Sequence, residues 1–154
     1  MDEQRETGYL SHRGIRLKVE MNGPAVSGIS FEGPGKDHPA ISPLMASTLE
    51  HLREYLAGTR KECTLPVEIR GTEFQRAVWD ALRQIPRGET RSYGEIARQI
   101  NRPLAARAVG QAAHRNPLPV IIPCHRLVGA KGQLTGFAGG LGIKRLLLEL
   151  EREG

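Results

Sequence analysis

The spacing of apolar residues changes its period near Gly71, and this change limits the folds that the chain can adopt. Before Gly71, residues 15–21 alternate between apolar and charged side chains, as in a strand that is buried on one face. After it, apolar residues recur at steps of three and four, as in amphipathic helices. We therefore expect an α/β fold of the α+β kind, with a small antiparallel sheet and a helix in residues 1–70 and a mostly helical domain in residues 71–154.

Three further elements are expected in the first domain. The pair Asn22-Gly23 predicts a tight turn into a second strand over residues 26–31. Apolar residues at helical spacing predict a helix over residues 45–56 that ends before Gly58. Residues 63–69 have the composition of a last strand.

Capping sequences and turn residues mark the helix boundaries in the second domain. Residues 72–75 and 92–95 each fit a capping box, which places a helix start at both. Pro86 and Gly88 end the first of these helices, and a third helix is expected from about Leu104 to His114 after a tight turn. Two short helices joined by a turn predict a helix-turn-helix, a pattern that many small helical bundles share. A final amphipathic helix has its apolar stripe at Ile143, Leu146, Leu147 and Leu150.

The positive charge of the chain lies in the second domain. Residues 1–69 carry 8 basic and 10 acidic side chains, a net charge of −2, whereas residues 70–154 carry 14 and 7, a net charge of +7. Twelve of these 14 basic residues are Arg, whose planar group binds phosphate through two parallel hydrogen bonds. The charge fits a nucleic-acid partner, and it fits a basic protein without such a partner equally well.

The third helix of the second domain consists mostly of small residues around Arg107. Small side chains allow a helix backbone to come close to whatever it packs against. One interpretation is close packing on a neighbouring helix, and the other is insertion into a narrow groove with Arg107 as the one long side chain. The composition alone does not choose between them.

A proline-rich segment begins at Asn116 and ends in the run Cys124-His125-Arg126. Its three prolines around a short apolar stretch predict a stiff, extended backbone that presents Cys124. A buried cysteine is more often a small hydrophobic residue than a nucleophile, but the two basic neighbours favour the thiolate. Since adjacent residues on an extended backbone point to opposite faces, His125 would act on Cys124 across a turn or through a bridging water. The candidate carboxylates to orient the imidazole are Glu149 and Glu151.

Metal, cofactor and membrane functions find no support in the sequence. The chain has two cysteines, Cys63 and Cys124, and its histidines and cysteines show no C-x2-C or H-x3-H spacing. It has no phosphate-binding glycine loop, so we expect no metal and no cofactor. No apolar run approaches the roughly 20 residues of a membrane span, and the first six residues are too charged to open a signal peptide. We expect free thiols and a reducing, cytoplasmic location.

A set of short motifs follows one another through the second domain, from Gly71 to about Glu151. The motifs are Gly71–Gln75, Ile85–Thr90, Ser92–Ala97, Ala106–Gly110, Asn116-Pro117, Pro123–Arg126, and Gly139–Leu141 with Lys144. In kind and in order they resemble those of the O6-alkylguanine-DNA alkyltransferases (methylated-DNA–protein-cysteine methyltransferases). Residues 1–70 match only in outline the small ribonuclease-H-like domain that such proteins carry at the N-terminus.

The resemblance implies a DNA-binding surface on the helix-turn-helix. In this family the helix-turn-helix enters the minor groove of double-stranded DNA, and Arg107 matches the arginine that takes the place of the extruded nucleotide. Tyr93 matches the tyrosine that crowds the 3′ phosphate and contacts the flipped guanine. Asn116 matches the asparagine hinge that ties the recognition helix to the active-site segment. The other residues that the resemblance places at the DNA are Ala106, Ala108, Gly110 and Arg126.

The resemblance also implies irreversible transfer of an alkyl group from guanine O6 to Cys124. Glu151 matches the glutamate of the family, which gives a relay from Glu151 through His125 and a water to Cys124. Tyr93 is the candidate proton donor to guanine N3. Because the thioether product has no hydrolysable acyl bond, we expect one turnover per molecule. The residues expected around the alkyl group and the guanine edge are Pro119, Leu127, Phe137, which stands where tyrosine is usual, and Ala138.

Three other functions compete with this one. An alkyltransferase-like damage sensor shares the fold but lacks the reactive cysteine, so Cys124 argues against it. A helix-turn-helix transcription regulator would need a dimer interface and base-reading polar side chains, whereas the third helix offers mostly alanine. A cysteine hydrolase would need an oxyanion hole, and the sequence does not locate one. We expect a monomer that binds double-stranded DNA containing O6-alkylguanine.

Overall fold

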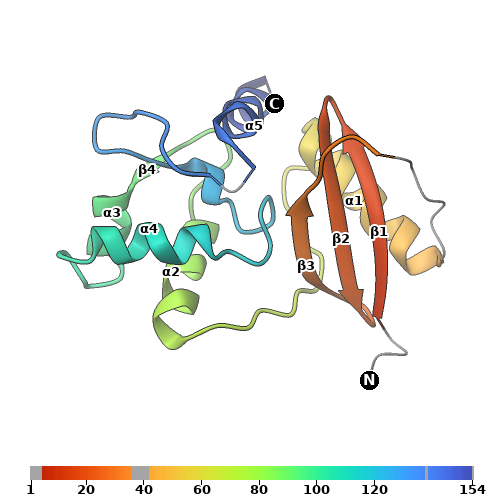
Figure 1. The fold of residues 1–154 in the computed structure, drawn as a ribbon, viewed down its shortest axis with the longest axis horizontal. Coiled ribbons are helices and arrows are strands. Elements are labelled where there is room, and N and C mark those ends of the chain that lie inside the picture. Colours follow the sequence, from red (N-terminus) through yellow and green to blue (C-terminus); the bar gives the residue numbers. More distant parts are fainter. Residues whose placement is uncertain (1–4, 36–41, 138, 154) are drawn as a thin grey trace.

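The computed structural model describes residues 5–35, 42–137 and 139–153, and these form a sheet half and a helical half (Figure 1). The sheet half holds three antiparallel strands that follow one another in the order of the sequence. Their bounds are Arg5–His12 for β1, Ile15–Asn22 for β2 and Ala25–Phe31 for β3. The two predicted strands are confirmed as β2 and β3, and the apolar residues of β2 are buried on one face as their alternation predicts.

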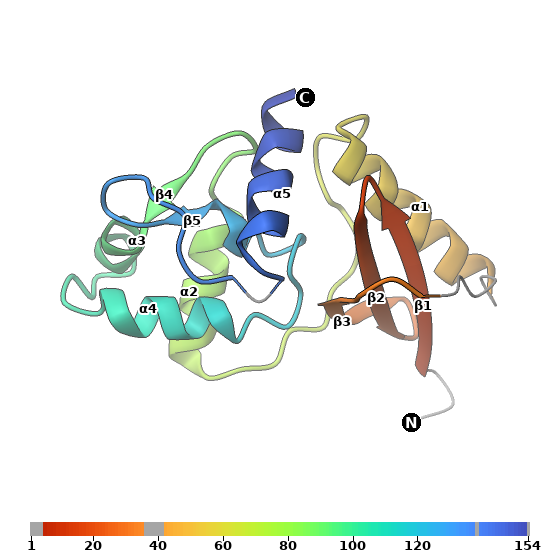
Figure 2. The ribbon, with the colours of Figure 1, turned by 45° about the horizontal axis from the view of Figure 1, so that its top comes forward.

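Strand β1 is not expected from the sequence, because its residues lack an alternating apolar pattern. Gly8 takes the place of an apolar side chain on the buried face of β1, at the point where helix α1 (Pro43–Ala57) crosses the sheet. A Cβ atom on Gly8 would lie 2.7 Å from the sulfur of Met45, so the missing side chain is what allows the helix to approach. Figure 2 shows α1 covering this face of the sheet.

Helix α1 begins and ends close to the predicted residues. The Ser42 hydroxyl accepts a hydrogen bond from the N–H of Met45 at the first turn, and Gly58 ends the helix with a φ of 83°. The strand predicted over residues 63–69 is wrong, because within this range Val67 alone forms a bridge, to Val26 of β3. Proline at position 66 has no N–H to donate, so the ladder does not extend.

The helical half begins at α2, and both predicted capping boxes form at its helix starts, at residues 72–75 and 92–95. Helix α2 ends three residues before Pro86, and α4 begins two residues after Leu104. The elements described in this half are α2 (Glu73–Arg83), β4 (Arg91–Ser92), α3 (Tyr93–Gln99), α4 (Ala106–His114), the 3-10 helix η2 (Cys124–Arg126), β5 (Leu127–Val128) and α5 (Leu141–Glu153).

Helices α3 and α4 form a helix-turn-helix that packs on α2. The turn between them passes through Asn101, whose φ of 62° lies in the left-handed region that asparagine tolerates better than most residues. The indole N–H of Trp79 in α2 donates to the carbonyl of Ala112 in α4 at 2.9 Å. One face of α4 is therefore pressed against α2, as the packing interpretation of its small residues predicts. The opposite face, which carries Arg107 and Gln111, is exposed.

The two halves meet along the edge strand β3. The N–H of Ile29 donates to the carbonyl of Pro117 at 2.9 Å, and the rings of Phe31 and Phe137 lie 5.3 Å apart. Helix α5 contacts both α1 and η2, and in Figure 2 it stands on the side of the helical half that faces the sheet half. We propose the domain boundary between residues 70 and 71, in the segment that leads from the sheet half to α2.

Candidate active site

The segment from Asn116 to Cys124 folds back on itself, which corrects the extended backbone expected from its prolines. The Asn116 amide closes the fold, since its Nδ2 donates to the Ile122 carbonyl at 2.8 Å and its Oδ1 accepts from the Leu118 N–H at 2.8 Å. Val120 turns the chain with a φ of 81°, in the left-handed region where a β-branched residue is strained. Each proline restricts φ only at its own position, so these two residues decide the path.

Cys124 opens η2 and lines a small cavity of about 30 Å³, which has room for a methyl-sized group. Its side chain is buried, with 9% of the residue exposed. Ala138, expected to read the guanine edge through its backbone, lies outside the described residues. The predicted residues that the structure brings together around this cavity are Tyr93, Gly110, Asn116, Pro119, Cys124, Leu127 and Phe137.

His125 and Glu151 form a buried pair, in which Nε2 of the imidazole lies 2.9 Å from Oε2 of the carboxylate. Burial lowers the pKa of His125 and outweighs the opposite effect of Glu151, so the ring is neutral at pH 7. A neutral ring that faces a carboxylate through Nε2 carries its proton there, which leaves Nδ1 as an acceptor. Nδ1 is buried and has no hydrogen-bonding partner among the described residues. Glu149, the other candidate carboxylate, is exposed on α5.

Arg126 is buried inside the protein, which corrects its predicted contact with DNA. Only 3% of the residue is exposed. Its guanidinium donates to the Glu151 carboxylate at 2.6 and 2.9 Å, to the Ile85 carbonyl at 2.6 Å and to the Tyr55 hydroxyl at 3.1 Å. These bonds join η2 to α5 and α1. We therefore assign Arg126 a structural role, and no sequence signal points to its partner Tyr55.

The thiol of Cys124 is protonated at neutral pH. Burial raises its pKa to about 11, although a hydrogen bond from Asn116 and the charge of Lys144 act in the opposite direction. This corrects the expectation that His125 and Arg126 favour the thiolate. The imidazole is neutral and the guanidinium is paired with a carboxylate, so neither offsets the burial. A base is needed to make the nucleophile.

Lys144, which belongs to one of the family motifs but has no role predicted from the sequence, is a buried residue of the site. Its ammonium donates to the carbonyl of Leu127 and, at 2.7 Å, to the carbonyl of Thr135. Burial lowers the pKa of Lys144, and a negative charge on Cys124 raises it. The signal that could have found it is its place on α5, because a charged residue three positions before the buried Leu147 lies in the apolar stripe.

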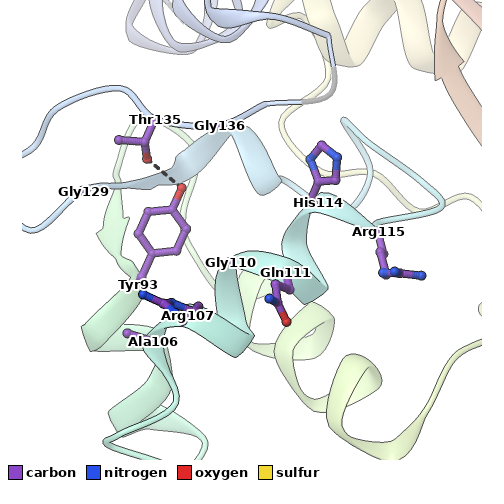
Figure 3. Close-up of a pocket in the computed structure, with 10 residues that line it drawn as sticks. All are labelled: Tyr93, Ala106, Arg107, Gly110, Gln111, His114, Arg115, Gly129, Thr135 and Gly136. Atoms are coloured by element: carbon purple, nitrogen blue, oxygen red, sulfur yellow. Dashed lines mark hydrogen bonds between the residues drawn. The ribbon is translucent and has the colours of Figure 1, made fainter.

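An open groove of about 820 Å³ runs beside the cavity (Figure 3). Helix α4 forms one wall with Arg107, His114 and Arg115, and the two arginines make the groove basic. Residues 129–136 contribute to the other wall. Ala108 is not among the residues that line it. The predicted DNA contacts that do line it are Tyr93, Ala106, Arg107 and Gly110. The residues that border both groove and cavity, and so join them, are Tyr93, Gly110, His114 and Gly136.

The described residues offer neither a metal-binding cluster nor a membrane-spanning helix. In the described ranges, no group of three or more His, Cys, Asp and Glu side chains is placed to hold a metal ion. No helix in the described part of the chain is long and apolar enough to cross a membrane. The lack of a cofactor stays a prediction.

The buried carboxylate of Glu151 makes the stability of the fold depend on pH. Burial raises the pKa of this carboxyl, but the hydrogen bonds from His125 and Arg126 outweigh that effect and lower the pKa from 4.5 to about 2. Because the folded value lies below the unfolded one, the stabilisation is complete above about pH 5 and is lost as the pH falls toward 2, by about 3 kcal/mol in total. Urea unfolding at about pH 7, 5 and 3 should show this loss, and a Glu151→Gln variant should lack it. An equal pH dependence in both proteins would contradict the assignment.

This chain is similar to known proteins in sequence and in structure. A family model described as the DNA binding domain of 6-O-methylguanine DNA methyltransferase matches residues 73–153. The methylated-DNA–protein-cysteine methyltransferase of Mycolicibacterium paratuberculosis is 56% identical over 107 residues, which are 70% of this chain and 65% of that protein. The alignment thus spans slightly less than two thirds of that relative's length. The protein of the same name from Mycobacterium bovis is 51% identical over 120 residues, 77% of this chain and 73% of that protein.

The likeness extends to the three-dimensional structure of both halves. The crystal structure of Mycobacterium tuberculosis OGT in complex with DNA matches this fold with a TM-score of 0.85 and 42% sequence identity. The match covers 96% of this chain and 92% of that one, so the sheet half is included. With the family model over residues 73–153, these similarities show that the chain belongs to the methylated-DNA–protein-cysteine methyltransferase family.

Proposed function

We propose that this protein repairs DNA by moving the alkyl group of O6-alkylguanine to its own Cys124, once per molecule. The observation that carries the proposal is the Cys124 thiol in a methyl-sized cavity that adjoins a basic groove. A thiol in this position can receive a small group from a base that has turned out of the duplex, and it cannot reach a base that is still stacked. The two relatives bear the name methylated-DNA–protein-cysteine methyltransferase, which gives methylated DNA and a protein cysteine as the two sides of the transfer.

Double-stranded DNA that contains the damaged base is the partner in this proposal. The Mycobacterium tuberculosis relative was crystallised with DNA. Helix α4 lies in the minor groove, where Ala106 and Gly110 leave room for the DNA backbone and Arg107 fills the gap left by the flipped nucleotide. Flipping a base costs a few kcal/mol and less for a damaged pair, so the lesion is selected. We propose that the protein acts as a monomer and that it is located in the cytoplasm.

The reaction begins with removal of the thiol proton of Cys124. Nδ1 of His125, the unpartnered acceptor described above, takes this proton through a bridging water. Glu151, 2.9 Å from Nε2, stabilises the imidazolium that forms. The buried ammonium of Lys144 stabilises the thiolate. This relay supplies the nucleophile that a thiol with a pKa of about 11 does not supply by itself.

The thiolate then displaces guanine from the alkyl carbon. A carbon–sulfur bond forms while the bond from that carbon to guanine O6 breaks, and the electron pair stays on the guanine. The Tyr93 hydroxyl gives a proton to guanine N3, and the proton held by His125 replaces it. No cofactor takes part in these bond changes and proton transfers. The product is a thioether, which water does not cleave, so Cys124 is not regenerated.

The proposal is tested with duplex DNA whose O6-methylguanine carries a radioactive methyl carbon. We expect the label in the protein to saturate at one per chain and the DNA to retain unmodified guanine. Continuous release of labelled methanol would make the protein a hydrolase. Tight binding with all of the label left in the DNA would make it a damage sensor. Either of these two results contradicts the proposal.

The role of Arg107 in base flipping predicts a substrate-dependent effect of its removal. An Arg107→Ala variant should transfer methyl groups from duplex DNA about tenfold more slowly, because it no longer offsets part of the flipping cost. Transfer from O6-methylguanine supplied as the free base should be unchanged, since Arg107 lines the groove and not the cavity. Arg83→Ala removes the same charge outside the groove and is the matched control. Equal slowing on both substrates would refute this role.

A further inference from the structure

Thr135 holds the hydroxyl of Tyr93, and the sequence predicts no role for it. Its Oγ1 atom lies 2.7 Å from the Tyr93 hydroxyl oxygen, and either atom can be the donor (Figure 3). Thr135 comes from the loop between β5 and α5, on the wall of the groove opposite α4. The two hydroxyls therefore meet where the groove adjoins the cavity of Cys124.

The backbone of Thr135 is anchored from inside the protein. Its carbonyl accepts a hydrogen bond from the Lys144 ammonium at 2.7 Å, and the same ammonium also binds the carbonyl of Leu127. Lys144 has no exposed surface. Leu127 follows η2 directly and lines the cavity beside Cys124. This anchor fixes the position of Thr135 relative to the reacting sulfur.

The ring of Tyr93 is held independently by helix α4. A Cβ atom added to Gly110 would lie 3.3 Å from Cε1 of Tyr93, so the ring rests against the helix where there is no side chain. The phenol is thus fixed at two points, its ring by Gly110 and its oxygen by Thr135. Loss of the second contact leaves the hydroxyl free to move in the open groove.

We propose that Thr135 is a positioning residue that keeps the Tyr93 hydroxyl aimed at guanine N3 during alkyl transfer. The inference rests on the proposed function, in which Tyr93 gives a proton to that nitrogen. A threonine hydroxyl can both donate and accept, so it can donate to the phenol oxygen once the phenol proton turns to the base. A phenol that accepts a hydrogen bond is a better proton donor, because the bond stabilises the charge left on its oxygen.

The test measures single-turnover transfer with two duplexes, one with O6-methylguanine and one with O6-methyl-3-deazaguanine, which has a C–H in place of N3. On the first duplex, Thr135→Val should slow transfer about fivefold, the ratio for one neutral hydrogen bond. Thr135→Ser, which keeps the hydroxyl, should stay within about twofold of the wild type. On the second duplex, all three proteins should react at one common, lower rate, because the proton acceptor is gone.

A double-mutant cycle with Tyr93→Phe separates positioning from loop damage. In the Tyr93→Phe background, Thr135→Val should cause no further loss, since the two residues act as one unit. Thr135→Ala serves as a second variant if Thr135→Val alters the thermal midpoint. A loss that persists on the 3-deaza duplex or in the Tyr93→Phe background would overturn the inference, and so would a Thr135→Val rate equal to the wild type. If the proposed function itself were wrong, the wild-type protein would transfer no methyl group, which distinguishes that outcome from failure of the inference on Thr135.

Discussion

A Cys124→Ser variant should transfer no methyl group, while it still binds duplex DNA that contains O6-methylguanine. Serine fits the same buried space, so the fold and the groove are retained. Its hydroxyl is much less acidic than a thiol, and an alkoxide is a poorer nucleophile than a polarisable thiolate toward an alkyl carbon. We expect the transfer rate to fall below detection and the affinity for the lesion to stay within about threefold.

The matched control is Cys63→Ser. Cys63 is half-buried and borders a different cavity, so this variant should retain full stoichiometric transfer. Gel-shift titration gives the affinity, and label transfer from the DNA gives the rate. Residual transfer by Cys124→Ser, or loss of transfer in Cys63→Ser, would contradict the assignment of the acceptor.

Removal of the Glu151 carboxylate should destabilise the protein more than other single substitutions discussed above. Glu151→Ala leaves the guanidinium of Arg126 buried without its counter-charge, which typically costs about 3–5 kcal/mol. It also takes away the partner that stabilises a protonated His125. We therefore expect a lower urea midpoint together with slower methyl transfer.

Two further variants are compared with Glu151→Ala in the same experiment. Glu149→Ala alters the exposed carboxylate of the same helix and should change the free energy of unfolding by less than about 0.5 kcal/mol. Glu151→Gln keeps the shape of the side chain and loses its charge, so its cost should fall between the other two. A Glu151→Ala protein with wild-type stability would show that the pair with Arg126 contributes nothing to folding.

The fold was predictable where local patterns and tertiary packing agree. Strand β2 has one buried face, so its alternation is visible in the sequence, and the capping boxes of α2 and α3 depend on neighbouring residues alone. Strand β1 could not be predicted in this way, because Gly8 is required by its close contact with Met45 of helix α1, which lies far along the chain. Residues 63–69 were misassigned because their apolar composition was given more weight than Pro66, which has no N–H to extend the ladder.

The site was predictable in its chemistry and less so in its geometry. Spacing and resemblance point to Cys124, whereas the direction of Arg126 depends on a turn that its neighbours in sequence do not specify. The raised pKa of the thiol likewise depends on burial by distant elements. Lys144 contacts Leu127, and Thr135 contacts Tyr93, only after the chain has folded. No local pattern in the sequence therefore predicts these contacts.

The most direct test of the account is the mass of one tryptic peptide after reaction with duplex DNA containing O6-methylguanine. Trypsin releases Asn116 to Arg126, which contains Cys124 and no other cysteine. We expect this peptide to gain the mass of one methylene group, and the gain to saturate at one per protein. An unchanged peptide in a protein that binds the lesion tightly, or a gain on the peptide that carries Cys63, would contradict it.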